Sequence, residues 1–162
     1  MHKVFMGFCV LFGLATQAAA LSCLRPDPID TFHRVAAAEE SYYVLYGQLD
    51  FDAGALPGLV DQRRVLEPEP IPARFTGKGL TRSGFDADYS AAVDLQIRCA
   101  GPWCGSANAG VDAVIFARVD DGAVTVEVGA CGGTIFENPG QPVLDMLASC
   151  MRGERCLSQP LQ

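Results

Sequence analysis

Cysteine is the residue type that most constrains how this chain can fold. Seven cysteines occur in 162 residues, and six of them follow the apolar amino-terminal segment: Cys23, Cys99, Cys104, Cys131, Cys150 and Cys156. An even number of cysteines in a small exported domain predicts disulfide bonds. Zinc sites favour cysteines two to four residues apart or neighbouring histidines. Here the close pairs enclose four and five residues, and His33 is the one histidine beyond position 20. We therefore expect cross-links, with neither metal nor cofactor.

The first 20 residues have the three parts of a secretory signal peptide. Lys3 precedes the apolar run 4–15, and the segment ends in small residues at Ala18 and Ala20. Cleavage after Ala20 is the expected event, and cleavage after Ser22 is also compatible with the pattern. The apolar run is shorter than the roughly 20 residues that span a bilayer, which argues against a retained anchor. We expect residues 1–20 to be removed and the protein to be periplasmic or secreted, without stable membrane insertion.

A cut after Ser22 would make Cys23 the first residue. Bacterial lipidation of Cys23 would need the same cut, but Ala20-Leu21-Ser22-Cys23 departs from the usual order, in which Leu lies three residues before the cysteine. We do not expect lipidation.

The charge of the chain argues against a nucleic-acid partner. The formal charge is -7, and removal of Lys3 with the signal peptide leaves -8. A net acidic domain repels phosphate backbones. Lys3 and Lys78 are the only lysines, against ten arginines, which is typical of coding bias in a GC-rich bacterium.

The amino-terminal half predicts one helix and two strands. An irregular stretch runs from Cys23 to Pro28, and Asp30 is expected to cap a helix of about three turns that ends near Glu40. Tyrosines and aliphatic residues predict a strand over 41–51, with Gly47 as a bulge or bend. Glycines and prolines predict a long loop over 52–72. A second strand over 73–81 and a polar connection over 82–90 follow.

The carboxy-terminal half has clearer patterns. Alternation of Val93, Leu95 and Ile97 with polar residues predicts a third strand over 92–99. Asp121-Gly122 predicts a hairpin of strands 111–119 and 123–131. A short helix is expected over 142–151. Five antiparallel strands with curved, glycine-containing members favour a mainly β, small closed barrel with a short helix near each end, and a sandwich is the alternative.

The last three predicted strands resemble the netrin-like module, the domain type of tissue inhibitors of metalloproteinases. The matching pattern is Val93-Asp94-Leu95-Gln96-Ile97, Trp103-Cys104-Gly105, Val114-Ile115-Phe116-Ala117, Asp121-Gly122 and a cysteine closing the last strand at Cys131. An early cysteine, Cys23, a short helix and a strand with a glycine near its end also match. The resemblance implies a five-stranded OB-type barrel over residues 21–162, as a single disulfide-stabilised domain.

The same resemblance implies a disulfide pairing and an inhibitory mechanism. Cys23 would bridge to Cys104 or Cys131, and we expect Cys23–Cys131, Cys99–Cys104 and Cys150–Cys156. In the inhibitors an amino-terminal cysteine chelates the protease zinc through its amine and carbonyl. Those proteins carry Cys-x-Cys there, whereas Cys23 is followed by Leu24 and Arg25, and inhibition would require cleavage directly before Cys23.

No catalytic constellation is recognisable in the sequence. His33 is interpreted as a solvent-facing helix residue, because a Ser-His-Asp or Cys-His enzyme needs its base beside a nucleophile. Gly105-Ser106-Ala107 is not a nucleophile elbow. Asp86-Ala87-Asp88 lacks the glycine and glutamate of a calcium loop and is interpreted as a solvated turn. We predict that the chain is not an enzyme.

Binding through a surface is the remaining class of function. Arg63 and Arg64, with apolar neighbours, lie in the proline-rich loop and form a candidate partner-binding site. The alternative is that this loop folds its apolar residues onto the barrel. Trp103 is expected to pack on a disulfide.

Three hypotheses follow. The preferred one is an exported, non-catalytic binding or structural module whose partner is another protein, with a protease as one candidate. The second is a metalloprotease inhibitor that acts through an amino-terminal Cys23. The third is an unrecognised enzyme, which would need a deep pocket with residues of shifted pKa.

Overall fold

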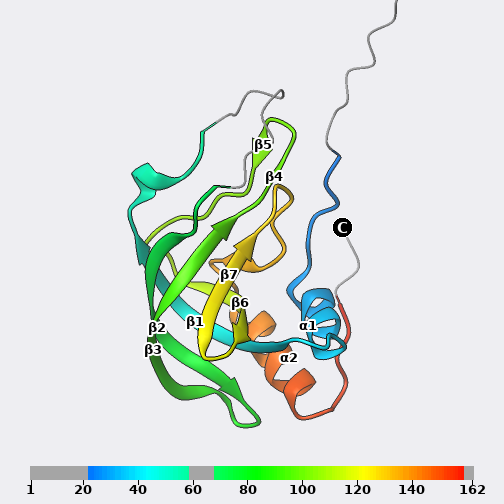
Figure 1. The fold of residues 1–162 in the computed structure, drawn as a ribbon. Helices are drawn as coiled ribbons and strands as arrows, with labels where there is room; N and C mark the ends of the chain where they lie inside the picture. Colours follow the sequence, from blue (N-terminus) through cyan, green and yellow to red (C-terminus); the bar gives the residue numbers. More distant parts are fainter. Residues whose placement is uncertain (1–21, 59–67, 159–162) are drawn as a thin grey trace, which may run out of the picture.

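The structure is a computed structural model that describes residues 22–58 and 68–158, and the fold is mainly β (Figure 1). Its long strands are β1 (Ser41–Phe51), β2 (Ile71–Thr81), β3 (Gly84–Ile97), β6 (Ala113–Asp120) and β7 (Ala123–Val128). Its short strands are β4 (Cys99–Ala100), β5 (Trp103–Cys104) and β8 (Ile135–Glu137). Its helices are α1 (Pro28–Ala36), the 3-10 turn η1 (Ala53–Ala55) and α2 (Gln141–Met151).

The long strands form one sheet that closes on itself. The strand order is β1-β2-β3-β7-β6, and β1 pairs with β6 as well as with β2, so the five strands make a ring. β8 extends the sheet along the first half of β6. The expected five antiparallel strands are wrong in one pairing, because β3 and β7 run parallel over Asp94–Ile97.

Buried aliphatic side chains and Phe75 fill the interior of the ring. They alternate along each strand with outward-facing residues, as a closed sheet requires. The largest fully buried ones are Leu45, Phe75, Leu95, Ile97, Ile115, Val126 and Val128. β1 and β2 approach closely where Gly47 pairs with Gly77. A Cβ atom on Gly77 would lie 2.3 Å from the Tyr46 carbonyl oxygen and 2.8 Å from the Phe75 ring. Glycine here leaves room for the neighbouring backbone of β1 and for the Phe75 ring.

Both helices pack on the outer face of the ring. A second apolar cluster joins Ile29 of α1 and Leu144 and Leu147 of α2 to Val114 and Phe116 of β6. Among the described residues, no helix is long and apolar enough to cross a bilayer.

The first helix begins earlier than expected. The prediction placed Asp30 at the cap and the helix end near Glu40, whereas α1 runs from Pro28 to Ala36. Asp27 is the cap, and its carboxylate accepts from the Ile29 backbone N–H at 2.7 Å. Proline suits the first helical position because its missing N–H has no partner there in any case.

The predicted polar connection 82–90 is wrong, because Gly84–Ser90 form the first half of β3. β2 and β3 form one long hairpin whose register shifts between Gly79 and Leu80. Asp86-Ala87-Asp88 therefore lies in a strand and not in a turn. Both faces of this segment carry exposed residues, so the alternation that reveals a half-buried strand is missing.

Other boundaries also shift. β2 begins at Ile71, inside the segment predicted as loop 52–72, because the buried Ile71 side chain belongs to the core. β3 ends at Ile97, so Cys99 lies in β4 and not in the third strand. β8 was not predicted.

The Asp-Gly hairpin is confirmed. β6 and β7 flank a turn at Asp121 and Gly122, which have φ values of 45° and 84°. Val124, Val126 and Val128 face the core, and α2 lies within one residue of the predicted helix.

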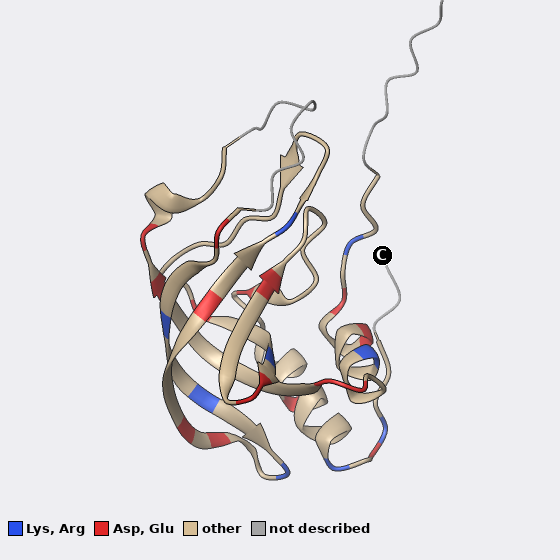
Figure 2. Cartoon of the chain, in the orientation of Figure 1, with Lys and Arg blue, Asp and Glu red and all other residues tan. Residues whose placement is uncertain are grey.

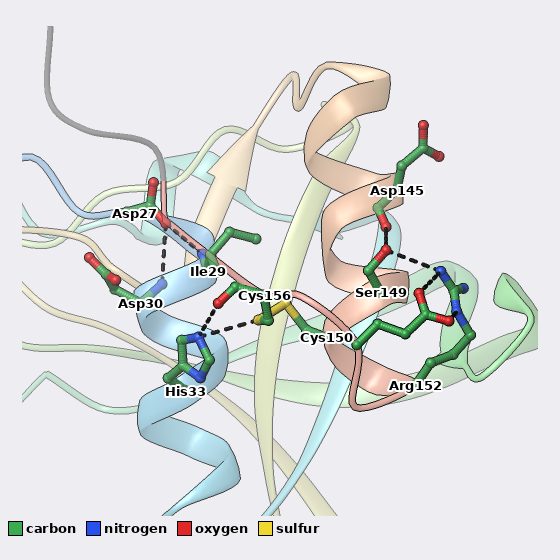
Figure 3. Close-up of a disulfide and its surroundings, with 10 residues drawn as sticks. Asp27, Ile29, Asp30, His33, Asp145, Ser149, Cys150, Arg152 and Cys156 are labelled. Carbon is green, nitrogen blue, oxygen red and sulfur yellow. Dashed lines mark hydrogen bonds and ion pairs between the residues drawn. A yellow bond between two sulfur atoms is a disulfide. The ribbon is translucent and has the colours of Figure 1, made fainter.

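Three disulfides are present, with the pairing expected: Cys23–Cys131, Cys99–Cys104 and Cys150–Cys156. Cys99 and Cys104 lie directly opposite each other in the β4–β5 hairpin. Cys150–Cys156 joins the end of α2 to the segment that lies against α1 (Figure 3).

Candidate functional site

The amino-terminal segment is fixed to the sheet by a disulfide. Cys23 bonds to Cys131, in the loop 129–134 that follows β7, with a Cα–Cα distance of 5.4 Å. Both cysteines are exposed, so the cross-link lies on the surface of the domain. It ties together residues that are 108 positions apart in the chain.

The other end of this segment is fixed by α1. The Asp27 carboxylate caps the helix through Ile29 and Asp30. The buried Thr31 hydroxyl donates to the Gly133 carbonyl oxygen at 3.0 Å, and the Arg34 guanidinium donates to the same oxygen at 3.1 Å. The loop 129–134 thus holds both the start of the segment and the helix that ends it.

Residues 23–27 form an exposed ridge between these two fixed points, and we name it the N-terminal ridge. Leu24 lies at its centre with 85% of its surface exposed. Among the described residues it is the most exposed large apolar side chain, and it is held on a segment that is fixed at both ends.

One groove adjoins the ridge, and a second groove shares Arg34 and Gly132 with the first. The first has a volume of about 410 Å³ and is lined by Leu24, Pro26, Arg34 and Cys131, among others. The second, about 590 Å³, also contains Arg34 and extends along the outer face of β6 and β7.

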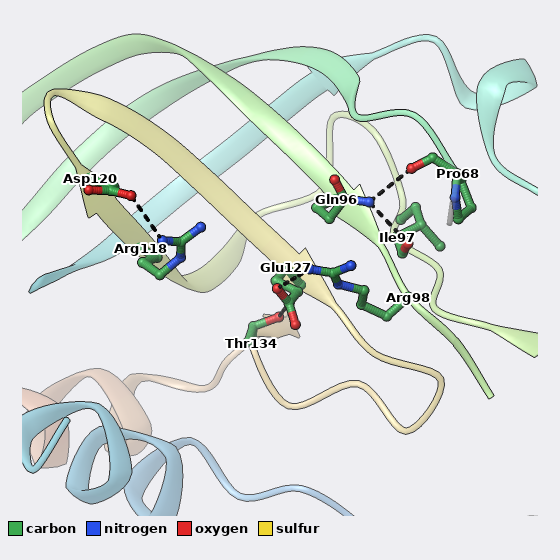
Figure 4. A network of polar contacts seen from close by, with 8 residues as sticks. All are labelled: Pro68, Gln96, Ile97, Arg98, Arg118, Asp120, Glu127 and Thr134. Atoms are coloured by element: carbon green, nitrogen blue, oxygen red, sulfur yellow. Dashed lines mark hydrogen bonds and ion pairs between the residues drawn. The ribbon is translucent and has the colours of Figure 1, made fainter. Parts of the chain in front are cut away.

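The second groove contains more positive than negative side chains. Three arginines line it, Arg34, Arg98 and Arg118, against the two carboxylates Glu40 and Glu127. Arg98 and Glu127 form an ion pair at 3.2 Å with about half of each side chain exposed. The Thr134 hydroxyl donates to the Glu127 carbonyl oxygen, which ties the start of β8 to β7 (Figure 4). The groove therefore combines hydrogen-bond donors with an apolar floor at Val35 and Phe116.

His33 lies outside these grooves and contacts the third disulfide. Its Nε2–H donates to the Cys156 carbonyl oxygen at 3.1 Å, and the same nitrogen lies 3.3 Å from Cys156 Sγ (Figure 3). The ring is exposed, and its contacts attach the segment after α2 to α1. Within residues 22–58 and 68–158, no group of three His, Cys, Asp or Glu side chains is arranged to hold a metal ion.

A further groove of about 510 Å³ lies between α2 and the tip of the β2–β3 hairpin. Arg152 binds Glu154 through two nitrogens at 2.8 and 2.9 Å, and it donates to the Ser149 hydroxyl at 3.0 Å. The hydrogen bond from Arg152 lowers the pKa of the Glu154 carboxyl.

The predicted partner-binding site in the proline-rich loop lies outside the described residues. This applies to Arg63 and Arg64 and to their apolar neighbours Leu59, Val60, Val65 and Leu66. Trp103 is 38% exposed, and its ring lies 3.9 Å from where a Gly101 Cβ would be, over the β4–β5 hairpin.

Sequence reasoning missed the N-terminal ridge and its grooves. Leu24 lies between Cys23 and Arg25 in a short irregular segment, which carries no periodic signal. Arg34, Arg98 and Arg118 are far apart in the chain, and only the fold brings them to one groove.

Comparison with known proteins identifies no relative. The chain matches no protein-family model, no curated protein and no solved structure.

Proposed function

We propose that the chain is an exported, non-catalytic protein-binding module of netrin-like, OB-type architecture that binds its partner through the N-terminal ridge. Support for the architecture comes from the five-stranded ring, in which the fourth long strand, β6, lies beside the first. That return to the first strand is the Greek-key feature of the OB-fold. The bridge from the early Cys23 to the cysteine after the last long strand fits the same module.

One observation carries the binding proposal. Leu24 is 85% exposed although its neighbours on both sides are fixed, Cys23 by the disulfide and Asp27 by the helix cap. Because the segment is already ordered, a partner that buries Leu24 loses little conformational entropy on binding. Arg34 lines the groove beside Leu24 and supplies a charged contact next to this apolar side chain.

Site-specific photocrosslinking tests this proposal. A photoreactive amino acid is placed at position 24 of the protein expressed in its own host, and the matched control carries it at Leu157, which is 53% exposed. We expect a discrete protein adduct from position 24 and none of the same mass from position 157. The proposal fails if neither position gives an adduct or if both give the same set.

A metalloprotease inhibitor is the second candidate, and the position of Cys23 favours it. Cys23 is exposed and its side chain is anchored, so a chain cleaved after Ser22 would present a free amine and a carbonyl from a fixed point. A catalytic zinc keeps one coordination position open for such ligands. The missing second cysteine of the inhibitor pattern weighs against this function.

The mature amino terminus separates the two candidates. Sequencing protein recovered from the host should give Leu21 as the first residue if the ridge acts only as a binding surface, and the signal peptide proposal itself fails if the first residue is Met1. A first residue Cys23, with inhibition of a zinc protease that disappears when the amine is acetylated, would establish the inhibitor instead.

A further inference from the structure

Most of β3 has an edge that no described strand covers. One edge pairs with β2 from Gly84 to Leu95. The other edge pairs with β7 only over Asp94–Ile97. Between Gly84 and Val93, no strand within residues 22–58 or 68–158 pairs with that second edge. Figure 1 shows this part of the β2–β3 hairpin extending below the turn that joins β6 and β7. An uncovered edge presents backbone N–H and C=O groups that another strand can bind.

Small side chains leave this edge accessible. Ala87, Ser90 and Ala92 are exposed, and Ala91 is half-buried. None of these side chains is long enough to fold over the backbone. A neighbouring strand needs a separation of about 4.8 Å to form a ladder, and this edge allows that approach.

An aromatic cleft opens beside the same edge. It has a volume of about 300 Å³ and is lined mainly by apolar side chains, including Tyr43 of β1, Tyr89 of β3, Leu80 and Met151. The Tyr43 and Tyr89 rings meet edge to face with centroids 5.3 Å apart, and Tyr43 is 44% exposed. Burial, and then the neighbouring Tyr43, raises the pKa of the Tyr89 hydroxyl. The cleft thus offers a partly dry aromatic surface at the end of the ring.

The charge of β3 indicates what kind of strand could bind. β3 contains three aspartates and no lysine or arginine, and Figure 2 marks acidic positions along its lower part. Asp88 is paired with Lys78 at 2.5 Å, and Asp86 accepts from the Thr81 hydroxyl at 2.6 Å. Asp94 lies opposite Pro72, which offers no charge. A second copy of β3 would add three more aspartates, so like charges disfavour a symmetric pairing.

We propose that the uncovered edge of β3 and the aromatic cleft together bind an extended, basic segment of a partner protein by strand addition. Backbone hydrogen bonds to β3 supply affinity, and one large apolar or aromatic side chain of the segment enters the cleft between Tyr43 and Tyr89. Lysine or arginine side chains of the segment pair with the aspartates of β3. This surface is separate from the N-terminal ridge and extends the proposed function to a second contact.

A peptide library tests the chemistry of the ligand. Random linear heptapeptides displayed on phage are selected on the full mature protein, with the double variant Ser90→Lys and Ala92→Lys as the comparison. We expect enrichment of basic peptides with one large apolar residue on the unsubstituted protein only. Ser106→Lys with Ala55→Lys, two exposed positions outside β3 and the strands that pair with it, adds the same charge and should leave the enrichment unchanged. The proposal fails if both double variants retain the enrichment or if nothing is enriched on the unsubstituted protein. In the second case the aspartates of β3 serve only to prevent other strands from pairing with this edge.

Amide hydrogen exchange with a selected peptide tests the geometry. Strand addition should slow exchange at alternate residues between positions 86 and 92, because every second N–H points to the uncovered edge. Tyr43→Ala should weaken peptide binding about tenfold or more, while a change of Leu24 to alanine should have no effect. Slowed exchange elsewhere with none in 86–92, or unchanged binding by Tyr43→Ala, would overturn the assignment. Unchanged binding by Tyr43→Ala together with loss of binding by Leu24→Ala would place the peptide on the N-terminal ridge instead.

Discussion

Removal of the Cys23–Cys131 disulfide should destabilise the domain more than removal of Cys99–Cys104. The two bonds close loops of very different length, with sequence separations of 108 and 5 residues. In the chain-entropy account, a cross-link stabilises by limiting the unfolded chain, and the effect grows with the logarithm of loop length. The expected losses in free energy of unfolding are about 4.7 kcal/mol for the long loop and about 2 kcal/mol for the short one.

The measurement is urea denaturation of two double variants, Cys23→Ala with Cys131→Ala and Cys99→Ala with Cys104→Ala. Far-UV circular dichroism is the appropriate signal. Tryptophan fluorescence is unsuitable because Trp103 is the one tryptophan and lies next to Cys104, so its emission would respond to the Cys104 substitution itself. Since small domains have a total stability of about 5–15 kcal/mol, the first variant should lose between about a third and nearly all of it, and its urea midpoint should lie below that of the second variant.

Equal losses for the two variants, or a larger loss for the short loop, would refute this reasoning. Such a result would mean that contacts in the folded state, and not the unfolded chain, determine what each disulfide contributes. The ridge would then owe its order to α1 more than to Cys23.

Three further predictions concern single residues. Gly77→Ala should cost about 2–3 kcal/mol or more in urea denaturation, because its Cβ would overlap the backbone of β1, whereas Gly58→Ala, which has nothing within 4 Å, should be neutral. Asp27→Ala should cost about 1 kcal/mol by loss of the cap, measured in the same way, and no loss would contradict the cap. Tyr89 should ionise at higher pH than a free tyrosine in an ultraviolet titration, and Tyr43→Phe should lower that pKa. Because the folded state holds this proton more tightly, the contribution to stability is complete below pH 10.0, the ordinary value, and decreases above it.

The parts of the fold that could be predicted are those fixed by local chemistry. Asp121-Gly122 accounts for the β6–β7 turn because both residues have positive φ. The first half of β3 could not be predicted, because its residues are exposed on both faces and its partner strand is set by the hairpin and not by burial. The parallel contact of β3 with β7 depends on ring closure, which no local pattern encodes.

The candidate site could not be predicted from the sequence for a related reason. The exposure of Leu24 is set by two anchors, and one of them, Cys131, is more than a hundred residues away. Asp30 was a reasonable cap from the sequence, but Asp27 competes for the same role and is followed by a proline that starts the helix. The two aspartates lie three residues apart, and the proline after Asp27 is the sequence signal that favours Asp27, because proline suits the first helical position.

The double pairing of β1 has a consequence for how the domain is assembled. Residues 41–47 pair with β6, which ends at Asp120. One edge of β1 therefore stays unpaired during synthesis until most of the polypeptide has left the ribosome. Contacts between such distant segments form slowly because a long loop must close first. During that interval β1 can pair only with β2, and aggregation through its open side is the principal hazard. A chaperone that covers this strand until β6 is available would reduce this hazard without changing the final product.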